Sequence, residues 1–330
     1  MNSNYMHSIA RHPLGIVAIV VALPTGCCTE QDKIALNDSG AAAPSSDAAQ
    51  AELIDAGGAA SSSDAARAEL IDQTPPSGSN GLAFDAEGMI WLADYFGDQV
   101  LKIDPANGEI LERYNDECNG AGPDDIAIDE QGRVFWTGFT NGVVGRIDPN
   151  TRDNVIIAEL PVGANPIAFS DDGRLFVGLA VINDGLYELD PEGVEEPVLI
   201  ADALDNVNAF DFGPDGFLYG PQLINGAVVK IDVQNGEIVE TIADGYGFPC
   251  SVRYSEDDNL LYILSANPKS LSTIDLDDYS KRVFATPETQ AADNFAIGPD
   301  HNFYITGFDM PRINVVNVDG SGVQILDIGS

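Results

Sequence analysis

The feature that most constrains the fold is an internal repeat. A glycine or asparagine at a turn recurs every 41 to 44 residues through most of the chain. The series runs Gly88, Gly132, Gly173, Gly216, Asn259 and Asn302. A second marker, an acidic or amide residue that ends a later apolar run, recurs in step with it: Asp104, Asp148, Asp190, Asp232, Asp275 and Asn317. Two markers that step together indicate a true repeat.

Each repeat contains four short apolar runs separated by turn residues, as the segment Asn80–Gly108 shows. A period of about 40–45 residues that holds four short strands is typical of one blade of a β-propeller. Glycine and asparagine can share the turn position because both tolerate positive φ. The sequence therefore predicts an all-β fold over residues 79–330, a six-bladed β-propeller with four antiparallel strands per blade.

The N-terminal segment has the features of a targeting signal. Arg11 precedes an apolar run, Leu14 to Leu23, that is too short to span a bilayer as a permanent helix. The run ends in Leu-Pro-Thr-Gly-Cys27, which resembles a bacterial lipoprotein signal. We therefore predict a signal peptide over residues 1–26, lipidation of Cys27, and a protein outside the cytoplasm, anchored to a bacterial membrane in the periplasm or at the cell surface. An ordinary secretory signal is the alternative.

The next segment is rich in Ala, Ser, Gly, Asp and Pro and contains a tandem duplication. SSDAAQAELID at residues 45–55 is nearly repeated at residues 62–72. Such a composition lacks the apolar area that would offset the entropy of ordering. We predict a disordered tether over residues 27–78. The alternative for residues 68–72 is an extra strand at the closure between the last and first blades.

Charge and histidine content exclude several classes of function. The chain has 53 acidic and 15 basic residues, a net charge of −38. Such a surface repels nucleic acids and anionic lipids, so we expect a monomer that contacts a membrane only through its lipid anchor. Of the three histidines, only His301 follows the signal, and it lies in a turn predicted to face away from the channel mouth. A catalytic triad and a histidine-ligated zinc centre are therefore excluded.

The two cysteines of the predicted propeller are Cys118, at the entry to the second blade, and Cys250, at the start of the fifth. These blades face each other across a sixfold ring. A disulfide would require the Cα atoms to lie within about 7 Å, with the Cys118 loop folded over the channel. Two unpaired, partly buried thiols are the alternative that we favour.

Polar residues precede the first strand of nearly every blade. Residues at this point ring the wider mouth of a propeller channel, and here they are Asn80, Asp124, Asn165, Asn208, Cys250 and Asp293. Five of the six are oxygen donors, the ligands that Ca²⁺ prefers. The alternative is that Asn and Asp only cap strand entries. Loops on the same face are expected to form a substrate wall with Asn165 and Asn208, through Tyr95, Phe96, Phe139, Gln222, Phe308 and Arg312.

Two segments at the mouth also carry a family resemblance. Ser79–Phe84 (SNGLAF), with Gly88 behind it, and Pro123–Asp129 (PDDIAID), one blade later, resemble two segments of the gluconolactonase, senescence marker protein and luciferin-regenerating enzyme family. The resemblance implies a six-bladed propeller in which Asn80 and Asp124 bind a divalent cation and Asp124 is the base. The glutamate ligand and the substrate-holding arginine of that family have no clear counterpart here. NHL-type propellers match the generic repeat equally well.

These observations lead to one functional hypothesis and one alternative. The hypothesis is a metal-dependent lactone hydrolase, in which a cation, expected to be Ca²⁺, is held by Asn80, Asp124 and, by its position in the ring, Asp293. Asp124 activates water, and the substrate is a lactone or sugar. The alternative is a non-catalytic propeller on the cell surface that binds a small ligand or a protein. A purely structural propeller ranks third.

Overall fold

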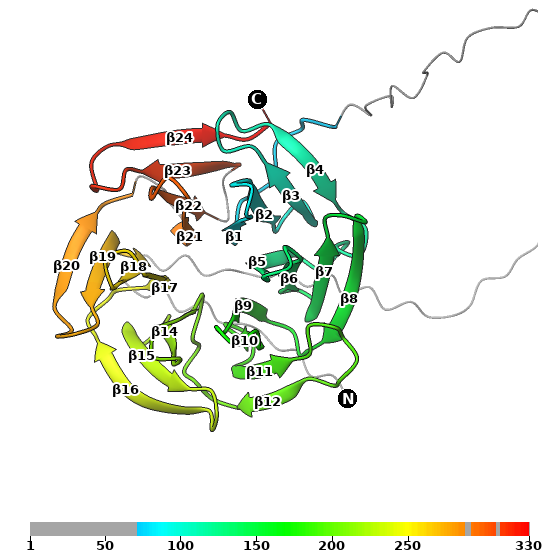
Figure 1. Ribbon diagram of the computed structural model, residues 1–330. Helices are drawn as coiled ribbons and strands as arrows, with labels where there is room; N and C mark the ends of the chain where they lie inside the picture. Colours follow the sequence, from blue (N-terminus) through cyan, green and yellow to red (C-terminus); the bar gives the residue numbers. More distant parts are fainter. Residues whose placement is uncertain (1–70, 288–291, 308–310, 330) are drawn as a thin grey trace, which may run out of the picture. The chain divides into compact units, whose positions relative to one another are not determined.

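The computed structural model describes residues 71–287, 292–307 and 311–329. These residues form six four-stranded antiparallel sheets arranged around a central axis, as Figure 1 shows. In each sheet the strands pair in the order of the sequence. The predicted six-bladed propeller with four antiparallel strands per blade is thus confirmed, and the described residues contain no helix. No part of the described chain provides a helix suited to crossing a membrane.

Blades one to three contain β1 (Leu82–Phe84), β2 (Ile90–Asp94), β3 (Gln99–Ile103), β4 (Ile110–Tyr114), β5 (Pro123–Ile128), β6 (Val134–Gly138), β7 (Val143–Asp148), β8 (Asp153–Glu159), β9 (Ala164–Phe169), β10 (Leu175–Leu179), β11 (Gly185–Leu189) and β12 (Val198–Ala201). Blades four to six contain β13 (Asp211–Phe212), β14 (Leu218–Gln222), β15 (Ala227–Asp232), β16 (Glu237–Ala243), β17 (Pro249–Ser255), β18 (Leu260–Ala266), β19 (Lys269–Asp275), β20 (Lys281–Ala285), β21 (Ala292–Ile297), β22 (Phe303–Gly307), β23 (Arg312–Val316) and β24 (Val323–Asp327).

The first strand of each blade lies nearest the axis and the fourth lies at the periphery (Figure 1). Because the strands alternate in direction, all six first strands begin on one face of the ring. The connections between second and third strands lie on that same face, as do the links from one blade to the next. We call it the entry face.

The core lies between neighbouring blades. Second strands such as β2, β6 and β10 are buried along their whole length because each is covered on both faces. Each of the first five blades has a buried aromatic residue on its second strand: Trp91, Phe135, Phe176, Tyr219 and Tyr262. Fourth strands such as β16 are largely exposed, as expected at the outer edge.

The turns between first and second strands follow the repeat, with one correction. Gly88, Gly132, Gly173 and Gly216 all have positive φ, and Asn259 continues the series with φ 56°. In blade six the left-handed residue is His301 (φ 62°), one position before the predicted Asn302. The His301 N–H donates to Gly298 O, just as the Gly88 N–H donates to Asp85 O, so the sequence alignment was one residue out in this blade.

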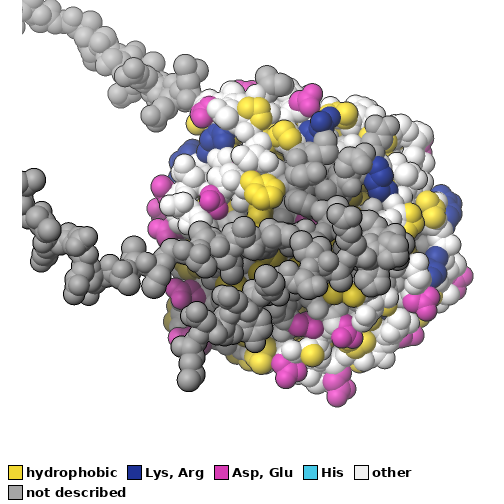
Figure 2. Space-filling view, turned by 180° about the vertical axis from the view of Figure 1, so that it is seen from behind, with side chains coloured by type: hydrophobic (Ala, Val, Ile, Leu, Met, Phe, Trp, Pro, Cys, Tyr) yellow, Lys and Arg dark blue, Asp and Glu magenta, His cyan; other side chains and the backbone are white. Residues whose placement is uncertain are grey.

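Acidic residues in these turns brace the backbone. Asp85 Oδ1 accepts hydrogen bonds from the N–H groups of Glu87 and Met89, at 3.1 and 2.8 Å. Its other oxygen accepts from Trp91 Nε1 and pairs with Lys102. In the view of Figure 2 acidic side chains lie around the edge of one face of the molecule. Much of the negative charge therefore has a structural role.

Residues at the C-terminal end of the predicted tether contact blade one. The side chain of Gln73 exchanges two hydrogen bonds with the backbone of Ile110, at 2.9 and 3.0 Å. The N–H groups of Ser77 and Gly78 donate to the carboxylate of Asp94. Residues 1–70, with the predicted signal, Cys27 and most of the tether, lie outside the described residues. The fourth strand of blade six is its own β24.

Candidate functional site

The first strands of blades two and six each begin with a β-bulge that contains one of the predicted ring residues. In blade two, Pro123 pairs with Gly138 and Ile126 with Trp136, so the first strand has one residue more than its partner between these pairs. Blade six has the same irregularity between Ala292 and Phe295. A bulge re-aims the side chains within it. Asp124 and Asp293 both lie inside such a bulge.

The ring residues are gathered on the entry face and withdrawn from solvent. Asn80, Asp124, Asn165, Asn208 and Cys250 are all buried, and Asp293 is partly buried. The side chain of Asn80 hydrogen-bonds the carboxylate of Asp124, and the charge of Asp293 acts on the same carboxylate. The three residues predicted as metal ligands therefore interact with one another.

This arrangement makes both ring carboxylates hard to ionise. Burial raises the pKa of Asp124 well above its usual range, the negative charges of Asp293 and Asp125 raise it further, and the hydrogen bond from Asn80 opposes the shift. Burial and the charge of Asp125 raise the pKa of Asp293 to about 7. A carboxyl group whose pKa lies near neutrality is suited to proton transfer.

Two amide oxygens of the ring are buried without a hydrogen-bond partner, Oδ1 of Asn80 and Oδ1 of Asn208. A buried acceptor left unsatisfied costs about 1–3 kcal/mol. Blades one and four are opposite each other in a sixfold ring, so the two asparagines lie on opposite sides of it. Orphaned acceptors beside two carboxylates are the donor chemistry that a hard cation or a ligand hydroxyl would satisfy.

No three His, Cys, Asp or Glu side chains within the described ranges form a cluster that could hold a metal ion. The residues that could hold a cation here form a mixed donor set, with carboxylates from Asp124 and Asp293 and an amide oxygen from Asn80. Oxygen donors of this kind match Ca²⁺, whose remaining positions water can fill. Cys250 is the one ring residue that offers no oxygen, and its buried Sγ lies 3.4 Å from the carbonyl oxygens of Leu264 and Ala292.

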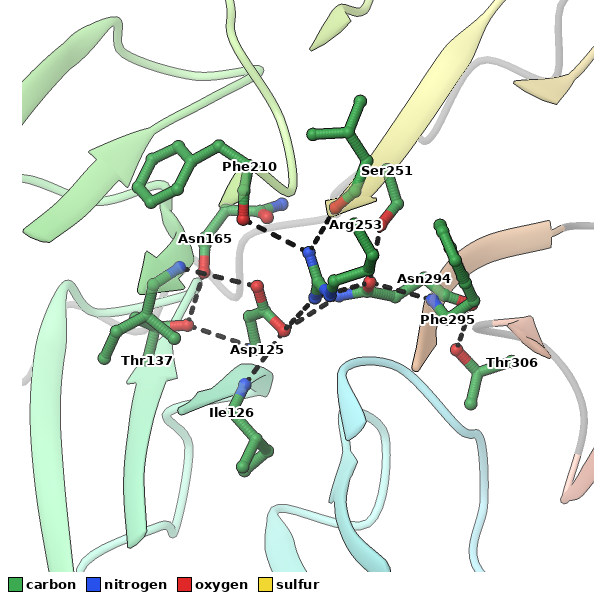
Figure 3. Close-up of polar contacts among 12 residues, drawn as sticks. Asp125, Ile126, Thr137, Asn165, Phe210, Ser251, Arg253, Asn294, Phe295 and Thr306 are labelled. Carbon is green, nitrogen blue, oxygen red and sulfur yellow. Dashed lines mark hydrogen bonds and ion pairs between the residues drawn. The ribbon is translucent and has the colours of Figure 1, made fainter. Parts of the chain in front are cut away.

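A second polar layer follows the ring residues by one and three positions along the chain. Figure 3 shows Asp125, Arg253 and Asn294 meeting near the axis. Asn294 Nδ2 donates to Asp125 Oδ1 at 2.8 Å, and Arg253 Nη2 donates to Asn294 Oδ1 at 3.0 Å. Ser251 Oγ also donates to Asn294 Oδ1, at 2.8 Å. The guanidinium of Arg253 lies 3.8 Å from Asp125 and bonds the carbonyl of Phe210. We call these residues the axial network.

The axial network connects blade two to blade six through the bond between Asp125 and Asn294. Gly81 of blade one lies against Asp125, where a side chain would not fit. A Cβ atom on Gly81 would lie 2.4 Å from both Cα and Oδ1 of Asp125. The N–H of Gly81 donates to the backbone carbonyl oxygen of Asp124 at 2.6 Å, which joins blade one to the backbone of this ring residue. Glycine is thus required here for close approach.

Replacing Gly81 with Ala should push blades one and two apart at the ring. The added methyl would clash with backbone atoms, so we expect a loss of about 1–3 kcal/mol in the free energy of unfolding. The comparison variant is Gly216→Ala, where a Cβ meets nothing within 4 Å but φ is +77°. Denaturation should show both variants weakened. Amide exchange should be faster at Ile126, whose N–H donates to Asp125, only in Gly81→Ala. Equal exchange in both would contradict the close-approach explanation.

The predicted wall residues divide into three groups. Tyr95 is half-buried and Phe96 exposed, and their rings contact each other with a centroid distance of 5.0 Å. Phe139 and Gln222 are buried, and Gln222 Nε2 donates to Leu204 O, which indicates a structural role. Arg312 is partly exposed at the start of β23, and Phe308 lies outside the described residues.

Sequence reasoning missed the axial network. Asp125, Arg253 and Asn294 stand next to or near the ring residues but were not singled out. A signal was present at the third position after each ring residue, where four blades have alanine and two have Asp211 and Arg253. Charged residues where the other repeats carry alanine indicate side chains near the axis. The two cysteines, Cys118 and Cys250, are buried and unbridged.

A six-bladed propeller with a ring of amides and carboxylates on its entry face is the class that fold and site define. No family model matches the chain. A curated relative, the gluconolactonase of Zymomonas mobilis, is 29% identical over 139 residues, which is 36% of this chain and 38% of the relative. The match thus spans less than two fifths of the relative's length.

Solved structures show the same fold at low identity. A streptogramin B lyase matches with TM-score 0.60 and 15% identity, covering 77% of this chain and 84% of the lyase. A calcium-binding regucalcin from Agrobacterium tumefaciens matches with TM-score 0.56 and 18% identity over 74% and 83% of the two chains. A gluconolactonase from Xanthomonas campestris matches with TM-score 0.56 and 18% identity over 71% and 84%. The chain therefore has the fold of these propellers and is similar over part of its length to a gluconolactonase.

Proposed function

We propose that the propeller is a metal-dependent lactone hydrolase that acts at the ring on its entry face. The observation that carries the proposal is the contact of Asn80 with Asp124 beside Asp293, with a partnerless amide oxygen on Asn80. The similarity to a gluconolactonase and to a calcium-binding regucalcin supports both the reaction class and the ion. The predicted lipid anchor at Cys27 remains part of the proposal and would place the reaction outside the cytoplasm.

The residues of the ring would have different roles. Asp124 and Asp293 with Asn80 would hold the cation, and Asn208 offers a further oxygen. A divalent ion held by these residues would supply Lewis acidity toward the ester carbonyl. Asp124 would accept the proton of the attacking water, because burial raises the pKa of its carboxyl group and so makes the carboxylate a stronger base. Burial of the ring limits access of bulk water.

The test is hydrolysis of lactones by the purified full-length chain. We expect turnover of glucono-δ-lactone, γ-butyrolactone or their substituted relatives in Ca²⁺ or Zn²⁺, and loss of turnover with chelator. Because an ion that binds only the folded state stabilises it, Ca²⁺ at 100 times its dissociation constant should add about 2.7 kcal/mol to the free energy of unfolding. No turnover together with a melting temperature unchanged by Ca²⁺ would remove the proposal and leave the binding propeller.

A further inference from the structure

Large apolar side chains are exposed on the entry face from blade one to blade four. They lie in connections between second and third strands, or in the link between blades two and three, and their exposed fractions run from 38% to 72%. They are Phe96, Val162, Val181, Ile182 and Ile224. Most other exposed aliphatic side chains lie on outer strands, for example Val283 on β20. We call the five the apolar rim.

Hydrogen bonds join the neighbouring connections that carry part of the rim. Asn183 Nδ2 donates to Val162 O at 2.8 Å, which joins the link after blade two to the connection in blade three. The N–H of Val181 donates to Asn206 Oδ1 at 2.7 Å, and the N–H of Leu223 donates to Asn206 O at 3.2 Å. Ile224 follows Leu223 directly. Hydrogen bonds thus join the three neighbouring connections that carry Val162, Val181 and Ile224.

The aromatic residues extend the rim to the ring. Phe96 contacts Tyr95, and Tyr95 contacts Phe139 with a centroid distance of 6.0 Å. Phe139 O accepts a hydrogen bond from Gly163, beside Val162. Burial raises the pKa of Tyr95 and the nearby charge of Asp124 raises it further, so this tyrosine lies on the side of the ring carboxylate. A ligand at the ring would therefore have apolar side chains around it on this side.

The backbone conformation of Val181 is a further indication that the rim side chains have a functional role. Its φ is +69°, a region that is strained for a β-branched residue. Strain of this kind concentrates at functional sites. Asparagine or glycine would fit the backbone better, yet the position presents a valine side chain to solvent.

We propose that the substrate of this site is a neutral lactone with an unbranched apolar chain, and that the chain lies along the apolar rim. This inference rests on the proposed function. The net charge of −38 on the chain disfavours an anionic ligand and would favour release of the carboxylate product after ring opening. A sugar lactone would leave the rim exposed to water, whereas an alkyl chain would cover it.

The experiment uses a series of γ-lactones from butyrolactone to dodecalactone with the full-length protein, and the matching γ-lactams as non-hydrolysable ligands. A methylene buried from water contributes up to about fourfold in binding. We expect kcat/KM for the lactones and affinity for the lactams to rise about twofold to fourfold per methylene. Glucono-δ-lactone should be the poorer substrate. A flat chain-length profile in both series would overturn the inference.

Three variants localise the effect. Ile224→Ser and Val181→Asn should flatten the chain-length profile, and Val283→Ser, an exposed valine on the outer strand β20, should not change it. Val181→Asn should also raise the melting temperature by about 2 °C, because asparagine tolerates positive φ, so unfolding cannot explain its loss of binding. An unchanged profile in Ile224→Ser and Val181→Asn would place the chain elsewhere and overturn the assignment.

The outcomes separate this inference from the proposed function. If no lactone is hydrolysed but lactam affinity rises with chain length and falls in Ile224→Ser, the rim binds chains and the enzyme proposal fails. If lactones are hydrolysed without any dependence on chain length, the enzyme proposal stands and the rim assignment fails. If Ile224→Ser instead dissociates an oligomer in sedimentation, with the profile unchanged, the rim is an interface between copies and the inference is overturned.

Discussion

Replacement of Asp124 with Asn should lower lactone turnover about 10³-fold and leave the propeller folded. General-base catalysis contributes about 10²–10⁴-fold, and the amide has the size of the carboxyl group but cannot take up a proton. The measurement is kcat/KM with Ca²⁺ held at saturation. The matched control is Asp148→Asn, because the last repeat carries Asn317 at the position of Asp148. Turnover that survives in Asp124→Asn would refute the assignment of the base.

The same pair of variants has a pH signature in stability, measured without metal. A carboxyl group whose folded-state pKa is raised binds more protons in the folded than in the unfolded state. Its contribution to stability is therefore complete at low pH and is lost as pH rises through the folded pKa. For Asp293 this loss runs from near the usual value of 3.8 to about 7. Because Asp124 and Asp293 interact, the loss of stability over this pH range belongs to the pair.

Asp124→Asn should consequently be more stable than the unaltered protein at pH 8 in the absence of metal. The asparagine keeps the ring filled but removes one of two repelling carboxylates. Urea denaturation at pH 5 and pH 8 measures the difference, and Asp148→Asn should not show this rise in stability at pH 8. If Asp124→Asn were instead destabilised at pH 8, the two carboxylates would not be close enough to repel each other.

The repeat explains why the fold could be predicted from the sequence. Turn residues and strand ends recur at nearly constant spacing, and a ring of six places the residue before each first strand on one face whatever its identity. This geometry was enough to locate Asn80, Asp124 and Asp293. The error in this prediction concerns a single turn. The His301 turn was read one residue late, because asparagine is also a common left-handed residue at the next position.

The axial network could not be predicted from the spacing of the repeats. A bulge turns two consecutive residues of one strand to different partners, so Asp124 faces the ring while Asp125 bonds Asn294 of blade six. Bulges are not visible in a hydrophobic pattern of period two. The bond between Asp125 and Asn294 joins residues 169 apart in sequence, and a side chain on Gly81 would clash with the Asp125 oxygen that accepts it. Propensity and spacing contain no information about such a contact.

Trp91→Ala should produce the largest loss of stability, about 3–5 kcal/mol. Trp91 is fully buried between blades one and two, and its Nε1 donates to Asp85 Oδ2 at 2.9 Å. The substitution would leave a cavity and remove a partner from Asp85, which also pairs with Lys102 at 2.9 Å. Urea denaturation measures the loss, and Trp91→Phe should recover much of it because the ring fills part of the space.

Well below its melting temperature, Trp91→Ala should retain near-normal turnover per folded molecule, in contrast to Asp124→Asn. The cavity lies in the blade interface, but that interface also contains Ile126, two residues after Asp124. If the cavity collapsed by moving β5, Asp124 would move with it and kcat would fall in fully folded protein. Normal kcat in the folded variant would show that the bulge in β5, held by the axial network, fixes the position of Asp124 independently of the core behind it.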